Sequence, residues 1–171
     1  QQTIWTILAL YVEAALGWSA SQFGLVLMGA AVIYAYTQLA LFNKLQQRYG
    51  LAPLGAAASL LLATGQLMFA GLEASTMPYV LFAAATLCGV VGMTLCDATY
   101  MPAMAHASAH QHVGFAVSLG AMASSGGRVG APMLFGFLFE HVSHTVPFLL
   151  AAAAAVCGGG FYALYHALDL R

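Results

Sequence analysis

The chain has 171 residues, of which 62% are hydrophobic and 5% are charged, and its formal net charge is −1. A soluble domain carries about 25% charged residues, so four basic and five acidic side chains are too few to cover a soluble protein of this length. The near-neutral charge excludes the broad basic surface that nucleic-acid binding requires. We therefore predict an all-α integral membrane protein whose surroundings are a lipid bilayer, with no nucleic-acid partner.

The apolar sequence divides into one short segment and five segments that are long enough to cross a bilayer. A hydrocarbon core of about 30 Å requires roughly 20 helical residues. Residues 3–16 fall short of that length and end at Gly17-Trp18-Ser19, so we interpret them as the end of a truncated helix. Full spans are predicted over residues 23–42, 51–72, 78–104, 113–139 and 146–168, with a tight basic turn over residues 43–50.

Basic residues near helix ends predict the orientation of the chain, because cytoplasmic loops carry an excess of lysine and arginine. Lys44, Arg48 and Arg171 fall on one side when the spans are counted along the chain. The loops on the opposite side contain Glu73 and Glu140 but no lysine or arginine. We therefore expect the Lys44/Arg48 loop and the C-terminus to lie in the cytoplasm. The sequence does not indicate which cellular membrane holds the protein.

The basic turn has a recognisable pattern. Leu45, Arg48 and Gly50 stand in the spacing Gly-x-Leu-x-Asp-Arg-x-Gly-Arg-Arg, with Asn43 in place of the first glycine and Gln47 in place of the aspartate. The turn thus resembles the degenerate second copy of the short cytoplasmic loop motif of the major facilitator superfamily. No basic pair follows Gly50, which is a further departure from that motif.

The order of the spans extends this resemblance over nearly the whole chain. It follows helices seven to twelve of the superfamily, and the fourth full span is similar to helix eleven of tetracycline- and multidrug-type proton antiporters. The residues that carry this likeness are Gly114, Ser118, Gly127, Gly130, Pro132 and Gly136. The resemblance implies that residues 1–171 form the C-terminal six-helix bundle of a twelve-helix carrier, with most of helix seven missing.

The resemblance also implies a function. We expect secondary transport of a small solute by alternating access against a missing N-terminal six-helix half, with protons as the candidate coupling ion. No enzyme activity and no cofactor are expected. Two other classes stay open, namely a membrane-embedded structural or assembly subunit and, less favoured, a membrane metalloenzyme.

Asp97 and Arg128 are the only charged residues well inside the predicted spans. Charges at such depth often mark substrate or proton pathways. Helix geometry separates the two by about 10 to 20 Å in depth, so a direct salt bridge is not expected. Arg128 could face a cavity or bind backbone carbonyls, and Asp97 could serve a pathway, a solvated gate or a helix cap.

Further candidates for the pathway follow from the resemblance, in which helices eight and ten line the cavity. They are Tyr34 and Gln38 in the first full span and Tyr100 in the third. Ser125 could line a cavity or satisfy backbone groups. The alanine-rich helices nine and twelve are expected at the periphery.

Two remaining patterns concern packing and metal binding. Gly126 and Gly130 form a GxxxG motif, which allows another helix to approach closely. Five histidines flank the fourth full span, but the first cluster is predicted on one side of the membrane and the second on the other. We therefore predict no metal site for His106, His110, His112, His141 and His144.

Overall fold

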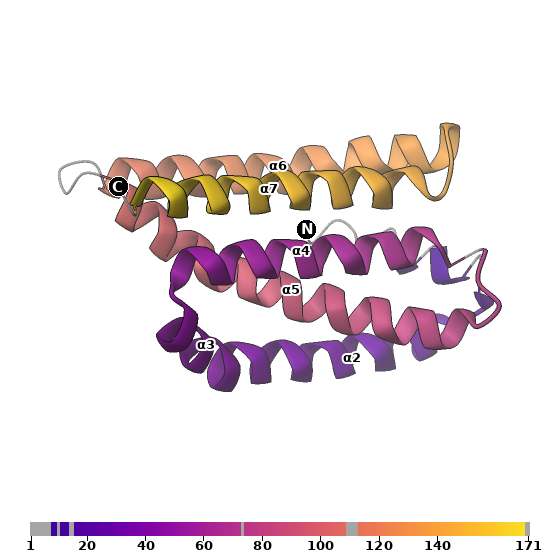
Figure 1. Cartoon of the computed structure of the whole chain (residues 1–171). Coiled ribbons are helices and arrows are strands. Elements are labelled where there is room, and N and C mark those ends of the chain that lie inside the picture. Colours follow the sequence, from indigo (N-terminus) through magenta and orange to yellow (C-terminus); the bar gives the residue numbers. More distant parts are fainter. Residues whose placement is uncertain (1–7, 10, 14–15, 73, 109–112, 170–171) are drawn as a thin grey trace.

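The computed structural model describes residues 8–9, 11–13, 16–72, 74–108 and 113–169, and these residues form a helical bundle without β-strands (Figure 1). The elements are α2 (Ala20–Tyr36), the π-helical turn η1 (Thr37–Leu41), α3 (Phe42–Tyr49), α4 (Leu51–Ala70), α5 (Pro78–Ala107), α6 (Val113–His141) and α7 (Val146–Asp169).

The described residues contain four helical segments that are long and apolar enough to cross a membrane. These segments are Ala20–Tyr49, Leu51–Ala70, Pro78–His106 and Val146–Ala167. Helix α6 is long enough, with 29 residues, but it is not among the four. Its serines, its glycines and Arg128 lower its mean hydropathy below that of the four candidate spans. The crossing of the membrane by α6 stays a prediction.

The helix starts at residues 51, 78, 113 and 146 agree with the sequence-based prediction, and local signals explain the starts of α2 and α5. Ser19 caps α2, because its Oγ accepts a hydrogen bond from the Gln22 N–H at 3.4 Å. The Gln22 side chain accepts one from the Ser19 N–H at 2.9 Å. Pro78 occupies the first turn of α5, where its missing N–H has no intrahelical partner to lose.

The predicted basic turn over residues 43–50 is wrong for residues 43–49, which are helical. The chain passes from α2 through η1 into α3 without a break, because the polar run consists mostly of good helix formers. The turn is reduced to Gly50, whose φ of 82° and ψ of 172° belong to a region that is essentially restricted to glycine. Figure 1 shows α3 and the C-terminal end of α7 at the same end of the bundle.

Helix α4 lies at the centre of the bundle, between α5 and α7 (Figure 1). Half of its span is buried, compared with 11% of the span that begins at Ala20. Helix α4 corresponds to helix nine of the resembled superfamily, so the expectation that helix nine is peripheral is wrong. Helix α7, which corresponds to helix twelve, packs extensively against α4. The physical reason is that the small alanine and glycine side chains of this alanine-rich helix allow it to approach its neighbours closely.

Glycines create the closest approach, which joins α4 to α5. A Cβ atom on Gly65 would lie 2.7 Å from the backbone nitrogen of Gly89. A Cβ atom on Gly92 would lie 2.5 Å from the backbone nitrogen of Leu62. Real Cβ atoms essentially never come this close, so the two backbones meet directly and no larger side chain fits between them.

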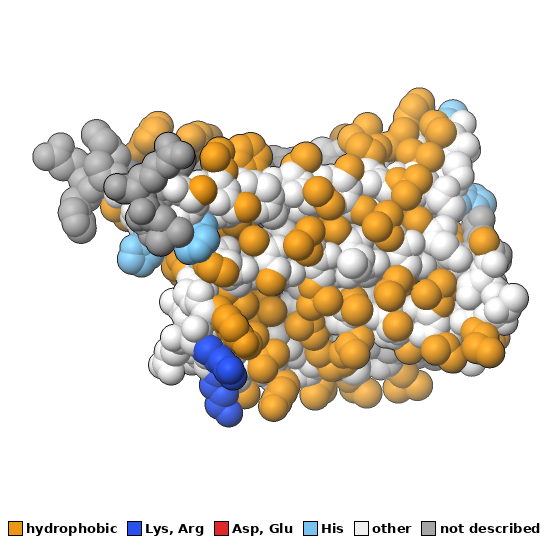
Figure 2. Space-filling model, viewed as in Figure 1, with side chains coloured by type: hydrophobic (Ala, Val, Ile, Leu, Met, Phe, Trp, Pro, Cys, Tyr) orange, Lys and Arg blue, Asp and Glu red, His pale blue; other side chains and the backbone are white. Residues whose placement is uncertain are grey.

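The face of the bundle seen in Figure 2 is apolar between its ends. Figure 2 shows hydrophobic side chains spread over the visible face, with lysine and arginine gathered at one end. Lys44 and Arg48 are both exposed on α3. Such a distribution is typical of a surface that faces lipid and ends at a basic interface.

Candidate functional site

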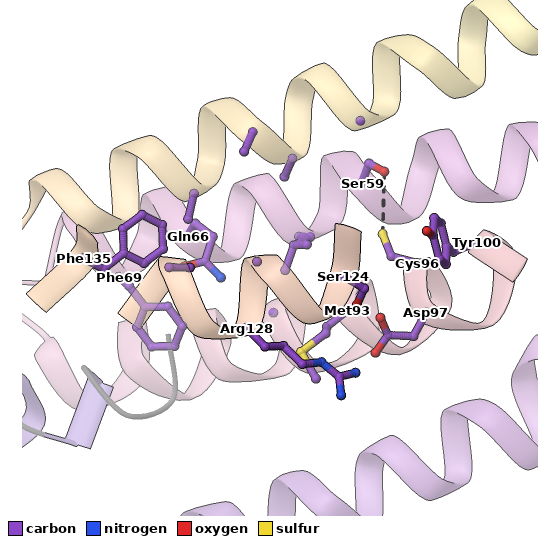
Figure 3. A pocket seen from close by; sticks show the side chains of 18 of the residues that line it. Ser59, Gln66, Phe69, Met93, Cys96, Asp97, Tyr100, Ser124, Arg128 and Phe135 are labelled. Carbon is purple, nitrogen blue, oxygen red and sulfur yellow. Dashed lines mark hydrogen bonds between the residues drawn. The ribbon is translucent and has the colours of Figure 1, made fainter. Parts of the chain in front are cut away.

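A cavity of about 510 Å³ lies among α4, α5, α6 and α7 (Figure 3). Its volume is within the range of about 300 to 1,000 Å³ that is usual for small-molecule sites. Most of the lining is aliphatic or aromatic. The polar or ionisable side chains that line it are Ser59 and Gln66 from α4, Cys96, Asp97 and Tyr100 from α5, Ser124 and Arg128 from α6, and Tyr162 from α7.

The two charges predicted inside the spans line this same cavity. The side chains of Asp97 and Arg128 are both exposed to accessible space, and Figure 3 shows their charged groups on the same side of the cavity. Within the described part of the chain, the Asp97 carboxylate and the Arg128 guanidinium form no salt bridge, which requires a nitrogen–oxygen distance of 4.0 Å or less. Each charge is therefore available to a solute or to water in the cavity.

Side-chain hydrogen bonds hold the helices together near Asp97. Ser59 Oγ donates to the carbonyl of Gly55 at 2.9 Å and lies 3.6 Å from Cys96 Sγ, with which it also forms a hydrogen bond (Figure 3). Thr99 Oγ1 and the Tyr162 hydroxyl are hydrogen-bonded at 3.3 Å. These contacts tie α4 and α7 to α5, so the cavity wall around Asp97 is fixed by three helices.

Comparison with known proteins supplies the family. The family model described as Major Facilitator Superfamily matches residues 1–169. The chain belongs to the Major Facilitator Superfamily. Members of this superfamily are generally membrane transporters rather than enzymes, and several apolar helices agree with an integral membrane protein. No curated protein and no solved structure matches the chain.

In this major facilitator chain, Gln66 is a cavity residue that the sequence analysis did not select. It is 5% exposed, and its Oε1 has no hydrogen-bond partner within the described part of the chain. It lies at the end of the cavity that contains Phe69 and Phe135, whereas Asp97 and Tyr100 lie toward the other end (Figure 3). The signal available in the sequence was a glutamine inside an otherwise apolar span.

Several predicted site residues lie outside the cavity. Gln38 is exposed on η1, Tyr34 is half-buried on α2, and Ser125 is exposed on α6. The neighbouring Ser124 lines the cavity instead, because residues four apart share a helix face and Ser124 is four residues before Arg128. Of the six predicted pathway residues, the structure thus brings together Asp97, Tyr100 and Arg128.

The glycines predicted to mediate packing of α6 have no neighbours in the described chain. Nothing lies within 4 Å of a Cβ atom built on Gly114, Gly126 or Gly130. The residue that packs is Gly120, whose Cβ position is occupied by the Tyr100 hydroxyl and the Met104 side chain of α5. Pro132 is exposed within α6, and the helix continues past it.

The basic motif and the histidines lie away from the cavity. Leu45 packs against a small core of Leu54, Ala58 and Leu95. The Arg48 guanidinium lies 5.4 Å from the centre of the Tyr49 ring. His106 and His141 are in the last turns of α5 and α6, which run in opposite directions and so place them at opposite ends of the bundle (Figure 1). His110 and His112 lie outside the described residues.

Proposed function

We propose that this chain is the C-terminal half of a proton-coupled secondary transporter that moves a small solute by alternating access. The observation that carries the proposal is one cavity that contains both Asp97 and Arg128, without a salt bridge between them. Ionisable residues inside membrane helices are costly and are generally retained for substrate or ion pathways. A carboxylate that faces a cavity can take up and release a proton, and a guanidinium there can hold a negative group of a solute.

The proposal assigns the exposed face of α6 to the N-terminal six-helix half. Residues 121–130 are all exposed, and Gly120 is the buried residue of α6. Along this helix, Gly126 and Gly130 form a stripe without side-chain bulk, which suits a helix packed closely against it. The proposal also places Lys44, Arg48 and the C-terminus in the cytoplasm, following the excess of basic residues on that side.

The test uses the complete protein encoded by the gene, reconstituted into proteoliposomes with an imposed pH gradient. Uptake is measured for a panel of drugs, sugars and organic anions. Asp97→Asn should abolish accumulation driven by the pH gradient, because an amide cannot exchange a proton in this range. Arg128→Ala should lower uptake as well, and Arg128→Lys should restore part of it.

Glu140→Gln is the matched control, since it also removes one carboxylate charge but lies at the end of α6 and outside the cavity. Its uptake should equal that of the wild-type protein. Unchanged gradient-driven uptake in both Asp97→Asn and Arg128→Ala would refute the coupling role. A gene that encodes no preceding six-helix half would refute the proposed architecture.

A further inference from the structure

A second cavity, of about 400 Å³, lies at the junction of α3 and α4 and shares no lining residue with the cavity that contains Asp97. Leu45 and Tyr49 of α3 form one wall, Leu95 belongs to α5, and α4 supplies the rest of the lining. Among the described residues that line it, Tyr49 is the only one whose side chain has a polar atom. Such a lining suits hydrocarbon and offers a polar solute few hydrogen-bond partners.

This cavity is open to the outside of the bundle. The side chain of Tyr49 is 55% exposed, and Ala57 on the α4 wall is exposed as well. Leu54 and Leu95, in contrast, are each 5% exposed and close the cavity toward the core. The cavity is therefore a groove that a molecule can enter from the surface of the protein.

The groove lies at the level of the lipid headgroups. Helix α2 and η1 together extend from Ala20 to Leu41, which is roughly 33 Å of helix at 1.5 Å per residue. This length already crosses a hydrocarbon core of about 30 Å. Helix α3 follows without a break, so its residues lie at the membrane interface. The α3–α4 junction thus stands where the headgroups meet the acyl chains.

Two basic side chains stand beside the groove. Lys44 and Arg48 are exposed and lie four residues apart, on one face of α3. The Arg48 guanidinium lies 5.4 Å from the centre of the Tyr49 ring, which is part of the groove wall. Within the described part of the chain, neither cation forms a salt bridge. Figure 2 shows basic side chains directly next to hydrophobic ones at this end of the bundle, so both charges are available to an anion.

We propose that the groove binds an anionic glycerophospholipid, with its phosphate at Lys44 and Arg48 and part of one acyl chain between α3 and α4. The proposal goes beyond the transport function and does not depend on it. An acyl chain that moves from the bilayer into the groove gains little hydrophobic free energy, because lipid tails are as apolar as the lining. The preference for an anionic lipid must therefore come from the two cations, at about fivefold in affinity for each.

The experiment titrates the purified complete protein in detergent with palmitoyl-oleoyl phosphatidylglycerol or phosphatidylcholine and counts bound lipids by native mass spectrometry. The two lipids have the same acyl chains and differ in net charge. The wild-type protein should bind phosphatidylglycerol roughly 20- to 30-fold more tightly, as expected for two basic residues. Lys44→Gln/Arg48→Gln should bring the ratio of the two dissociation constants close to one. Lys44→Arg/Arg48→Lys is the matched control, and it should keep the ratio because it keeps both charges.

A second pair of variants tests the apolar part of the groove. Ala57→Phe should weaken binding of both lipids, because its ring occupies the space between α3 and α4. Leu60→Phe also adds a ring to an exposed position of α4, but it lies outside the groove and should leave both affinities unchanged. Far-ultraviolet circular dichroism of every variant should match that of the wild type, since all the substituted side chains are exposed.

Four results would overturn the proposal. A preference for phosphatidylglycerol that persists in Lys44→Gln/Arg48→Gln would place the anion elsewhere. Unchanged lipid binding in Ala57→Phe would exclude the groove as the site of the acyl chain. Displacement of the lipid by an equal concentration of glycerol 3-phosphate would indicate a site for free phosphate groups. A dimer that Ala57→Phe dissociates would show that a second copy of the chain, and not a lipid, fills the groove.

Discussion

Gly92→Ala should destabilise the complete protein, because it places a methyl group at the closest contact between α4 and α5. The new Cβ would lie 2.5 Å from Leu62 N, 2.9 Å from Leu62 Cα and 3.0 Å from Ala58 O. All three atoms belong to the backbone, so no side chain can rotate away. To move from 2.5 Å to the 3.4 Å of an ordinary contact, the helices must separate by about 0.9 Å.

The size of the stability loss in Gly92→Ala follows from two opposing effects. Overpacking a well-packed interior costs about 1 to 3 kcal/mol, and replacing glycine by alanine within a helix gains about 1 kcal/mol. The net result should be a loss of up to about 2 kcal/mol, and Gly92→Val should lose more. The separation of the helices also removes dispersion contacts on both sides of Gly92.

The assay is reversible unfolding of the purified protein in mixed micelles of mild detergent and dodecyl sulfate, followed by far-ultraviolet circular dichroism. Gly160→Ala is the matched control, because Gly160 lies inside α7 with nothing within 4 Å of its Cβ position. That variant should be as stable as the wild type or more so. Equal stability of Gly92→Ala and Gly160→Ala would refute the backbone contact between α4 and α5.

Two further predictions concern the junction between α3 and α4 and the sidedness of the chain. Gly50→Ala should lower the free energy of unfolding by about 1 to 3 kcal/mol in the same assay, because alanine avoids the φ and ψ of Gly50. Gly71→Ala is the control and should change the free energy of unfolding little, because Gly71 has an ordinary φ of −86°. Arg48→Cys should react with a membrane-impermeant maleimide only from the cytoplasmic side of sealed vesicles, and Ser143→Cys, in the loop after α6, only from the opposite side. Labelling of both positions from one side would refute the predicted topology.

The sequence predicted the helices well and their packing poorly. The starts at residues 51, 78, 113 and 146 were predictable, because they follow polar or glycine- and proline-containing breaks in long apolar runs. Residues 43–49 were misjudged as a turn, because a run of polar residues resembles a loop in composition although its residues favour a helix. The central position of α4 was not predictable from its alanines and glycines, since the same residues suit a lipid-facing helix and a closely packed one.

The residues of the candidate site were likewise predicted only in part. Asp97 and Arg128 were selected because charges are rare inside spans, and both line the cavity. Tyr34 and Gln38 were selected by resemblance to a cavity-lining helix eight and lie outside the cavity. Gln66 could have been selected on the same physical ground as the charges, since an amide inside a span also requires a partner. The energetic cost of a charged or amide side chain inside a membrane span therefore predicts the residues of this cavity better than position in the family pattern does.

Arg128 constrains how α6 can sit in a membrane. The helix is less apolar than the four candidate spans, and an arginine near its middle costs about 2.5 to 3.5 kcal/mol on insertion scales if it faces lipid. Ser124, Gly127, Arg128 and Ala131 recur at intervals of three and four residues along one face, and all four line the cavity. This face therefore turns the guanidinium toward the cavity that also contains Asp97, and avoids much of that cost. The span from Ala20 to Tyr49 is also little buried, but its higher hydropathy suits direct contact with lipid. Of the two least buried helices, α6 is thus the one that requires cover from protein or water, and the proposed N-terminal half would supply it.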